Sequence, residues 1–66
     1  MYNCTETTHE DFYEKCGNYI STSEDKSDYY DNEAVYENYY TNGIEVSISD
    51  KNTGRSKGYV YYLYDL

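Results

Sequence analysis

Carboxylates and tyrosines are interleaved between positions 24 and 40, and no other stretch of the chain has as much potential for chemistry. This stretch holds six carboxylates and five tyrosines but one lysine. Carboxylates two apart on a strand lie about 6–7 Å from each other, and those three or four apart on a helix about 5–6 Å, close to the spacing of successive phosphates. Arginine binds carboxylate and phosphate in the same bidentate manner. The stretch is therefore suited to a basic groove built for nucleic acid.

The tyrosine rings distinguish this stretch from an acidic exterior that only keeps a protein dispersed. A solvated exterior needs the charges but not the rings, whereas rings add flat area for cation–π contact and stacking. A solvated exterior remains the alternative explanation. We expect one partner-binding surface formed by nine residues: Asp25, Asp28, Tyr29, Tyr30, Asp31, Glu33, Tyr36, Glu37 and Tyr40.

No feature of the sequence indicates catalysis. The only histidine, His9, falls in an expected first helical turn, and the chain has no phosphate-binding glycine loop and no nucleophile elbow. Carboxylates on an open face lack the environment that separates their pKa values for acid–base work. Cys4, His9 and Cys16 do not have the spacing of a metal site. We expect no enzyme activity, no cofactor and no metal.

A helix is predicted over residues 8–19. The residues from Thr7 to Glu10 have the form of a capping box, in which a threonine oxygen accepts a helical N–H and the glutamate reaches back. The apolar residues that follow recur at helical spacing: Phe12, Tyr13, Cys16, Tyr19 and Ile20.

A strand is predicted over residues 44–49, which alternate between apolar and other residues and so have one buried face, and a second strand is predicted over residues 59–64. Residues 28–41 suit a helix or a strand, and we favour the strand because valine, threonine and tyrosine are strand formers. Asn42-Gly43 predicts a type I′ turn between this strand and the next. The predicted fold is α+β, one N-terminal helix packed on a three-stranded antiparallel β-meander, with residues 1–66 as a single domain. The other face of the sheet is expected to be exposed and rich in tyrosine.

The negative charge is concentrated in the first two-thirds of the chain. The net charge is −8, and residues 1–43 carry all of it, with ten acids and two lysines. Such a field repels nucleic acid and anionic membrane and attracts basic surfaces. Aliphatic residues are scarce, so tyrosine must supply much of the core. A homodimer would relieve this shortage, and we leave it open.

The sequence favours a cytoplasmic location. No apolar run approaches the roughly 18 residues of a membrane span, and the N-terminus lacks the features of a signal peptide. In that compartment Cys4 and Cys16 stay reduced. A disulfide between them requires the leading residues to fold back, and this also stays open.

In length, acidity and composition the chain resembles the small phage-encoded anti-defence proteins, the anti-CRISPR and antirestriction DNA mimics. The resemblance implies a non-catalytic inhibitor that mimics nucleic-acid charge and blocks the DNA- or RNA-binding site of a host nuclease or CRISPR effector. It also implies that the partner is a basic nucleic-acid-binding protein, and that the chain itself binds no nucleic acid.

Residues 53–64 resemble the loop and third strand of an RNA-recognition motif, with the matching positions Lys57, Gly58, Tyr59, Tyr61 and Tyr64. This resemblance implies base stacking on Tyr59 and Tyr61. Val60 and Tyr62 depart from the pattern, and the net charge opposes RNA. Two alternatives to charge mimicry stay open: an acidic adaptor that docks proteins through exposed tyrosines, and a nucleic-acid binder that uses the hairpin at residues 55–64.

Overall fold

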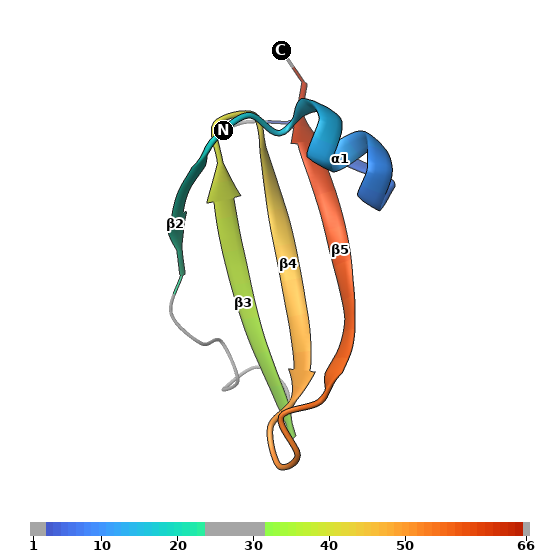
Figure 1. Cartoon of the computed structure of the whole chain (residues 1–66), viewed down its shortest axis with the longest axis vertical. Coiled ribbons are helices and arrows are strands. Elements are labelled where there is room, and N and C mark those ends of the chain that lie inside the picture. Colours follow the sequence, from blue (N-terminus) through green and yellow to red (C-terminus); the bar gives the residue numbers. More distant parts are fainter. Residues whose placement is uncertain (1–2, 24–31, 66) are drawn as a thin grey trace.

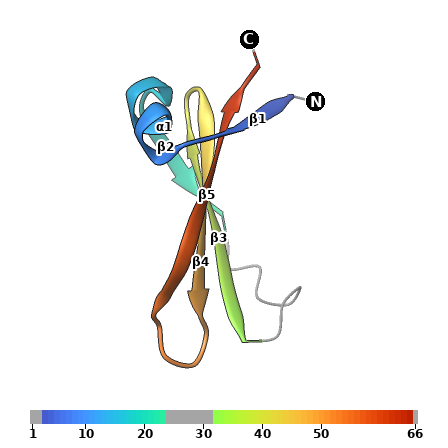
Figure 2. The ribbon, with the colours of Figure 1, turned by 90° about the vertical axis from the view of Figure 1, so that its right-hand side faces the viewer.

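The chain forms a twisted antiparallel sheet with one short helix against one of its faces (Figure 1). The computed structural model describes residues 3–23 and 32–65. Within these ranges the sheet has the strand order β1-β5-β4-β3-β2, and all neighbouring strands are antiparallel. The elements are β1 (Cys4–Thr7), α1 (His9–Lys15), β2 (Tyr19–Thr22), β3 (Glu33–Tyr40), β4 (Gly43–Asp50) and β5 (Ser56–Tyr64). Figure 2 shows α1 at one end of the sheet and the β4–β5 loop at the other.

The predicted fold, a helix on a three-stranded meander, is wrong. The described residues are mostly β, because β1 and β2 add a strand to each side of the predicted β3–β4–β5 meander. Both missed strands have only four residues, and neither has a buried face. They lie at the edges of the sheet, where pairing with β5 and β3 defines them and their own sequence pattern does not.

The helix begins as its capping signal predicts, but one residue later. Thr8 is the N-cap, and its hydroxyl accepts the backbone N–H of Asp11 at 3.2 Å. A helix that began at residue 8, as predicted, would have Thr7 as its N-cap. An N-cap of this kind satisfies one of the donors that the first helical turn leaves unpaired.

The helix ends at Lys15, well before the predicted end at residue 19. Gly17 follows with φ +78°, a left-handed conformation that glycine adopts at low cost and that stops a helix. Tyr19 and Ile20, which we assigned to the helical stripe, belong to β2 and are exposed.

The turn between β3 and β4 consists of Thr41 and Asn42, one residue earlier than predicted. Gly43 already pairs with the last residue of β3, and neither turn residue has the positive φ that a type I′ turn requires. The segment after α1 holds this turn, since the N–H groups of Thr41 and Asn42 donate to the carbonyls of Asn18 and Cys16 at 2.9 and 2.8 Å. Gly43 therefore belongs to β4.

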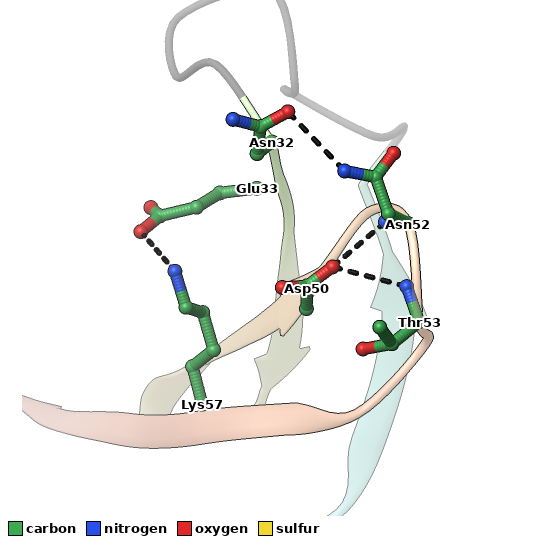
Figure 3. Close-up of polar contacts among 6 residues, drawn as sticks. All are labelled: Asn32, Glu33, Asp50, Asn52, Thr53 and Lys57. Carbon is green, nitrogen blue, oxygen red and sulfur yellow. Dashed lines mark hydrogen bonds and ion pairs between the residues drawn. The ribbon is translucent and has the colours of Figure 1, made fainter.

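The β4–β5 loop is built around Asp50 (Figure 3). Its Oδ1 accepts the backbone N–H groups of Thr53 and Asn52 at 3.0 and 2.8 Å. These two bonds favour the charged carboxylate and hold the pKa of Asp50 below its ordinary value. Nearby, Lys57 Nζ on β5 lies 3.0 Å from Glu33 Oε1 on β3. An ion pair this exposed contributes at most about 1 kcal/mol.

α1 packs on tyrosines. Phe12 is fully buried, and its ring centroid lies 5.1 Å from that of Tyr61 and 5.3 Å from that of Tyr40. Cys16 is buried in the same cluster, and Leu63 packs against it. The register of β3, β4 and β5 defines the residues of this helix-side face: Ala34, Tyr36, Asn38, Tyr40, Gly43, Glu45, Ser47, Ser49, Tyr59, Tyr61 and Leu63.

Most of the aliphatic side chains of the same strands lie on the opposite face, together with three tyrosines: Val35, Tyr39, Ile44, Val46, Ile48, Val60, Tyr62 and Tyr64. No described helix or strand packs over them. We expected the uncovered face to be the one rich in tyrosine, but the register places tyrosines on both faces and most of the aliphatic residues on the uncovered one. Alternation along a strand predicts two different faces, but it does not say which one a helix covers.

Candidate functional site

The structure divides the predicted binding residues of β3 between the two faces of the sheet. Successive side chains of a strand point to opposite faces. Tyr36 and Tyr40 therefore lie on the helix-side face, and Glu33 and Glu37 on the opposite face. The acids and the rings of β3 do not share one surface. The other five predicted residues lie outside the described residues: Asp25, Asp28, Tyr29, Tyr30 and Asp31.

Of these four β3 residues, Tyr36 has the most exposed side chain, at 36%. Tyr40 is half-buried against Phe12. Glu33 forms the ion pair with Lys57 (Figure 3), so its charge is already compensated, and Glu37 is half-buried. β3 thus offers a partner one accessible ring rather than a line of free carboxylates.

Tyr36, Ser47 and Tyr59 form a row across three strands, here called the tyrosine row. Tyr36 pairs with Ser47 and Ser47 pairs with Tyr59, all on the helix-side face. Neighbouring strands lie about 4.8 Å apart, so the two tyrosine-bearing strands are about 10 Å apart. Tyr59 is 52% exposed, and its ring stacks on Tyr61 with centroids 6.2 Å apart. The row presents two accessible rings with a small residue between them.

Glu45 lies next to this row and is buried, with 6% of its surface exposed. The Tyr13 hydroxyl on α1 donates to its Oε2, and Asn38 Nδ2 donates to its Oε1 at 2.9 Å. No lysine, arginine or histidine within residues 3–23 and 32–65 forms an ion pair with it. A buried charge is costly without compensation, and here the compensation comes from two neutral donors.

Sequence reasoning missed Glu45. It alternates with Ile44 and Val46, which predicts a carboxylate on the solvent side of a half-buried strand. The structure buries it because α1 covers its face of the sheet and brings Tyr13 over it. No local pattern in the sequence signals this burial.

The tyrosine hydroxyls around Glu45 have raised pKa values. Burial raises the pKa of Tyr13 above its ordinary value near 10, and the hydrogen bond and negative charge of Glu45 raise it further. Burial and then the charge of Glu45 also raise the pKa of Tyr40 and of Tyr61. Tyr13 therefore keeps its proton and acts as a donor to the carboxylate over the whole neutral range.

Stability is expected to fall as the pH rises above about 10. In the unfolded chain these phenols ionise near pH 10, while in the folded chain their raised pKa values hold the protons to higher pH. The unfolded state then binds fewer protons, so the free energy of unfolding decreases as the pH rises. Urea unfolding between about pH 8 and about pH 11 measures this slope. Tyr13→Phe should reduce it, and equal slopes for the two proteins would contradict the role given to Tyr13.

The residues that resemble an RNA-recognition motif do not form an open stacking surface. Tyr59 is exposed, but Tyr61 is only 8% exposed and lies under α1 against Phe12. Tyr64 alternates with both and lies on the opposite face. The implied stacking of bases on Tyr59 and Tyr61 together is blocked by the helix.

The opposite face is too small to argue for a homodimer on its own. Eight-residue strands at about 3.3 Å per residue and three strands at about 4.8 Å spacing give a footprint of roughly 26 by 14 Å. That is roughly 400 Å², about half of what each partner buries in a standard interface. Self-association therefore stays a prediction from composition, which sedimentation equilibrium checks directly.

The remaining candidates for chemistry lie apart from each other. Cys4 is exposed on β1 and Cys16 is buried beneath α1, and they form no disulfide. The ring of His9 lies edge-on to Tyr13 and Tyr61, with centroids 4.8 and 5.5 Å away. In the part of the chain that the structure describes, no three His, Cys, Asp or Glu side chains gather in a way that would hold a metal ion.

Fold and site together define a small antiparallel β-sheet protein with an exposed tyrosine row beside a buried carboxylate. No family model matches the chain, and no curated protein and no solved structure matches it either. Among the described residues, no helix has the length and apolar character needed to cross a membrane.

Proposed function

We propose that the chain is a non-catalytic binding protein that docks on a basic surface of another protein. The tyrosine row supports this proposal most directly, because its two accessible rings lie beside a buried carboxylate that has no cation of its own among the described residues. The net charge of −8 also supports a basic partner, since it speeds encounter with basic surfaces at low salt.

The partner class we favour is a nucleic-acid-binding enzyme, such as a nuclease or a CRISPR effector. The sites where such enzymes bind phosphate are rich in arginine and lysine, and an acidic protein with exposed aromatic rings complements them. In this role the chain inhibits the enzyme in the host cytoplasm by occupying the site that DNA or RNA would take. The compositional resemblance to anti-defence proteins supports this choice of partner.

The purified chain is expected to displace labelled DNA from such an enzyme at one-to-one stoichiometry, with an affinity that falls as salt rises. The double variant Tyr36→Ala/Tyr59→Ala should bind at least roughly tenfold more weakly, because truncating an anchoring ring costs about 1–2 kcal/mol or more. Fluorescence anisotropy of the DNA measures the displacement. Ile20→Ala is the control, since Ile20 is 63% exposed on β2 and lies outside the row.

The same assay separates charge mimicry from the adaptor alternative. If the tyrosine variant loses the partner but DNA never competes, the chain is an adaptor rather than an inhibitor of nucleic-acid binding. If changing Asp25, Asp28 and Asp31 to asparagine abolishes binding while the tyrosine variant binds normally, the charges act without the tyrosine row. A partner bound equally well by both variants contradicts the proposal.

A further inference from the structure

Two neighbouring features of the helix-side face are suited to a positively charged group. One is the pair of exposed rings in the tyrosine row, and the other is the buried charge of Glu45. The two rings belong to β3 and β5, and Glu45 belongs to β4 between them. Their chemistry is the same, because aromatic faces and carboxylates both attract cations.

The tyrosine row has the width that a cation between two rings requires. The strands that carry Tyr36 and Tyr59 are about 10 Å apart, so a group centred above Ser47 lies about 5 Å from each of these two strands. A cation interacts favourably within about 6 Å of a ring centroid. Ser47 is small and leaves the space above it unfilled by its own side chain. Tyr36 forms no ring contact or side-chain hydrogen bond with any described residue, so its ring is available.

Glu45 places a negative charge at one end of this space. It lies two residues before Ser47 on β4 and on the same face, which puts the two Cα atoms about 6–7 Å apart. Its carboxylate accepts hydrogen bonds from Tyr13 and Asn38, which fix its position without neutralising it. Because the carboxylate is buried, water screens its charge less than it screens a surface charge.

We propose that the tyrosine row binds an arginine side chain of the partner, with the guanidinium group between the rings of Tyr36 and Tyr59 and facing Glu45. Arginine is favoured over lysine because its planar group stacks on aromatic rings and is more weakly hydrated. The proposal rests on the proposed function, since it names the group of a basic partner that the tyrosine row receives.

A short blocked peptide containing one arginine tests the site without any partner protein. Titrated into the full chain, it is expected to shift the NMR signals of the Tyr36 and Tyr59 ring protons. The ring of Tyr19 is the internal control, because it is 57% exposed but lies on β2, where its hydroxyl bonds to Thr22 at 2.6 Å. The matched ligand is the same peptide with citrulline, which keeps the shape of arginine but has no charge, and it should cause no shift.

Variants on the row decide whether the rings themselves bind the cation. Tyr36→Leu should weaken arginine-peptide binding roughly fivefold or more, while Tyr36→Phe keeps the ring and should bind as the parent does. Tyr36 is exposed, and circular dichroism checks that each variant is folded. Equal shifts with the citrulline peptide, or unchanged binding by Tyr36→Leu, would overturn the site. If a partner is captured and the peptide does not bind, the arginine site is wrong and the proposed function stands.

Discussion

Replacing Phe12 with alanine is expected to lower the free energy of unfolding by about 3–5 kcal/mol. Phe12 is the one described side chain with 0% exposure, and its ring contacts those of Tyr13, Tyr40 and Tyr61. Alanine removes these contacts and leaves a cavity that a short helix on a rigid sheet cannot fill. Because small domains have a total stability of only about 5 kcal/mol or slightly more, a loss at the upper end of this range would leave a large fraction of the population unfolded.

Urea unfolding followed by circular dichroism measures this loss. Ile20→Ala is the matched control, since it also removes a large apolar side chain but from a position 63% exposed, and it should change stability by about 0.5 kcal/mol or less. Similar losses in the two variants would show that the packing of α1 on the sheet is not the core of this fold. If Phe12→Ala does not fold at all, Phe12→Leu gives a smaller, measurable loss at the same site.

Gly43→Ala is expected to cost about 1–3 kcal/mol or more, although alanine is otherwise the mildest replacement for glycine. A Cβ atom at this position would lie 2.5 Å from the backbone oxygen of Tyr62 and 2.8 Å from a ring carbon of Phe12. Neither neighbour is the end of a flexible side chain. The added methyl group must therefore separate β4 from β5 or lift α1 from the sheet.

The thermal unfolding midpoint of Gly43→Ala measures this cost. Ser49→Ala is the control, because it lies on the same strand and the same face but away from Phe12 and removes atoms rather than adding them. Its midpoint should stay close to that of the parent. A Gly43→Ala protein as stable as the parent would mean that the helix can shift freely on the sheet, which contradicts the tight packing of Phe12 and Tyr62 against Gly43.

The longer strands were accessible to sequence reasoning because residues 44–49 alternate with period two, and residues 33–40 and 59–64 are rich in strand-forming tyrosine and valine. Residues 44–49 and 59–64 lie within β4 and β5 as predicted, and residues 33–40 adopt the strand that we favoured over a helix. The four-residue strands β1 and β2 are too short for such a pattern. Tyr19 and Ile20 also continue the helical spacing of Phe12 and Cys16, so only the break at Gly17 separates the two elements.

The candidate site was harder to predict because nearness in sequence was taken as nearness on a surface. On a strand, neighbouring residues point to opposite faces, so the acids and rings of β3 separate. Tyr59 and Glu45 join Tyr36 only through the register of three strands, which no local pattern contains. Gly43 is a further example of what the sequence alone does not decide. A glycine indicates either a turn or a close approach of two chain segments, and Gly43 lies at a close approach.

The strand order has a consequence for how the chain folds. β5 is the last strand of the described chain, yet it lies inside the sheet between β1 and β4. The first strand therefore depends on contacts from the far end, such as the hydrogen bond from the Thr5 hydroxyl to Asp65, 60 positions away. Contacts this distant form slowly, because a long loop must close before they can stabilise anything. The hairpins formed by β3, β4 and β5 can assemble early, whereas β1 can pair only after β5 has formed, so the pairing of β1 with β5 is expected to be a late step of folding.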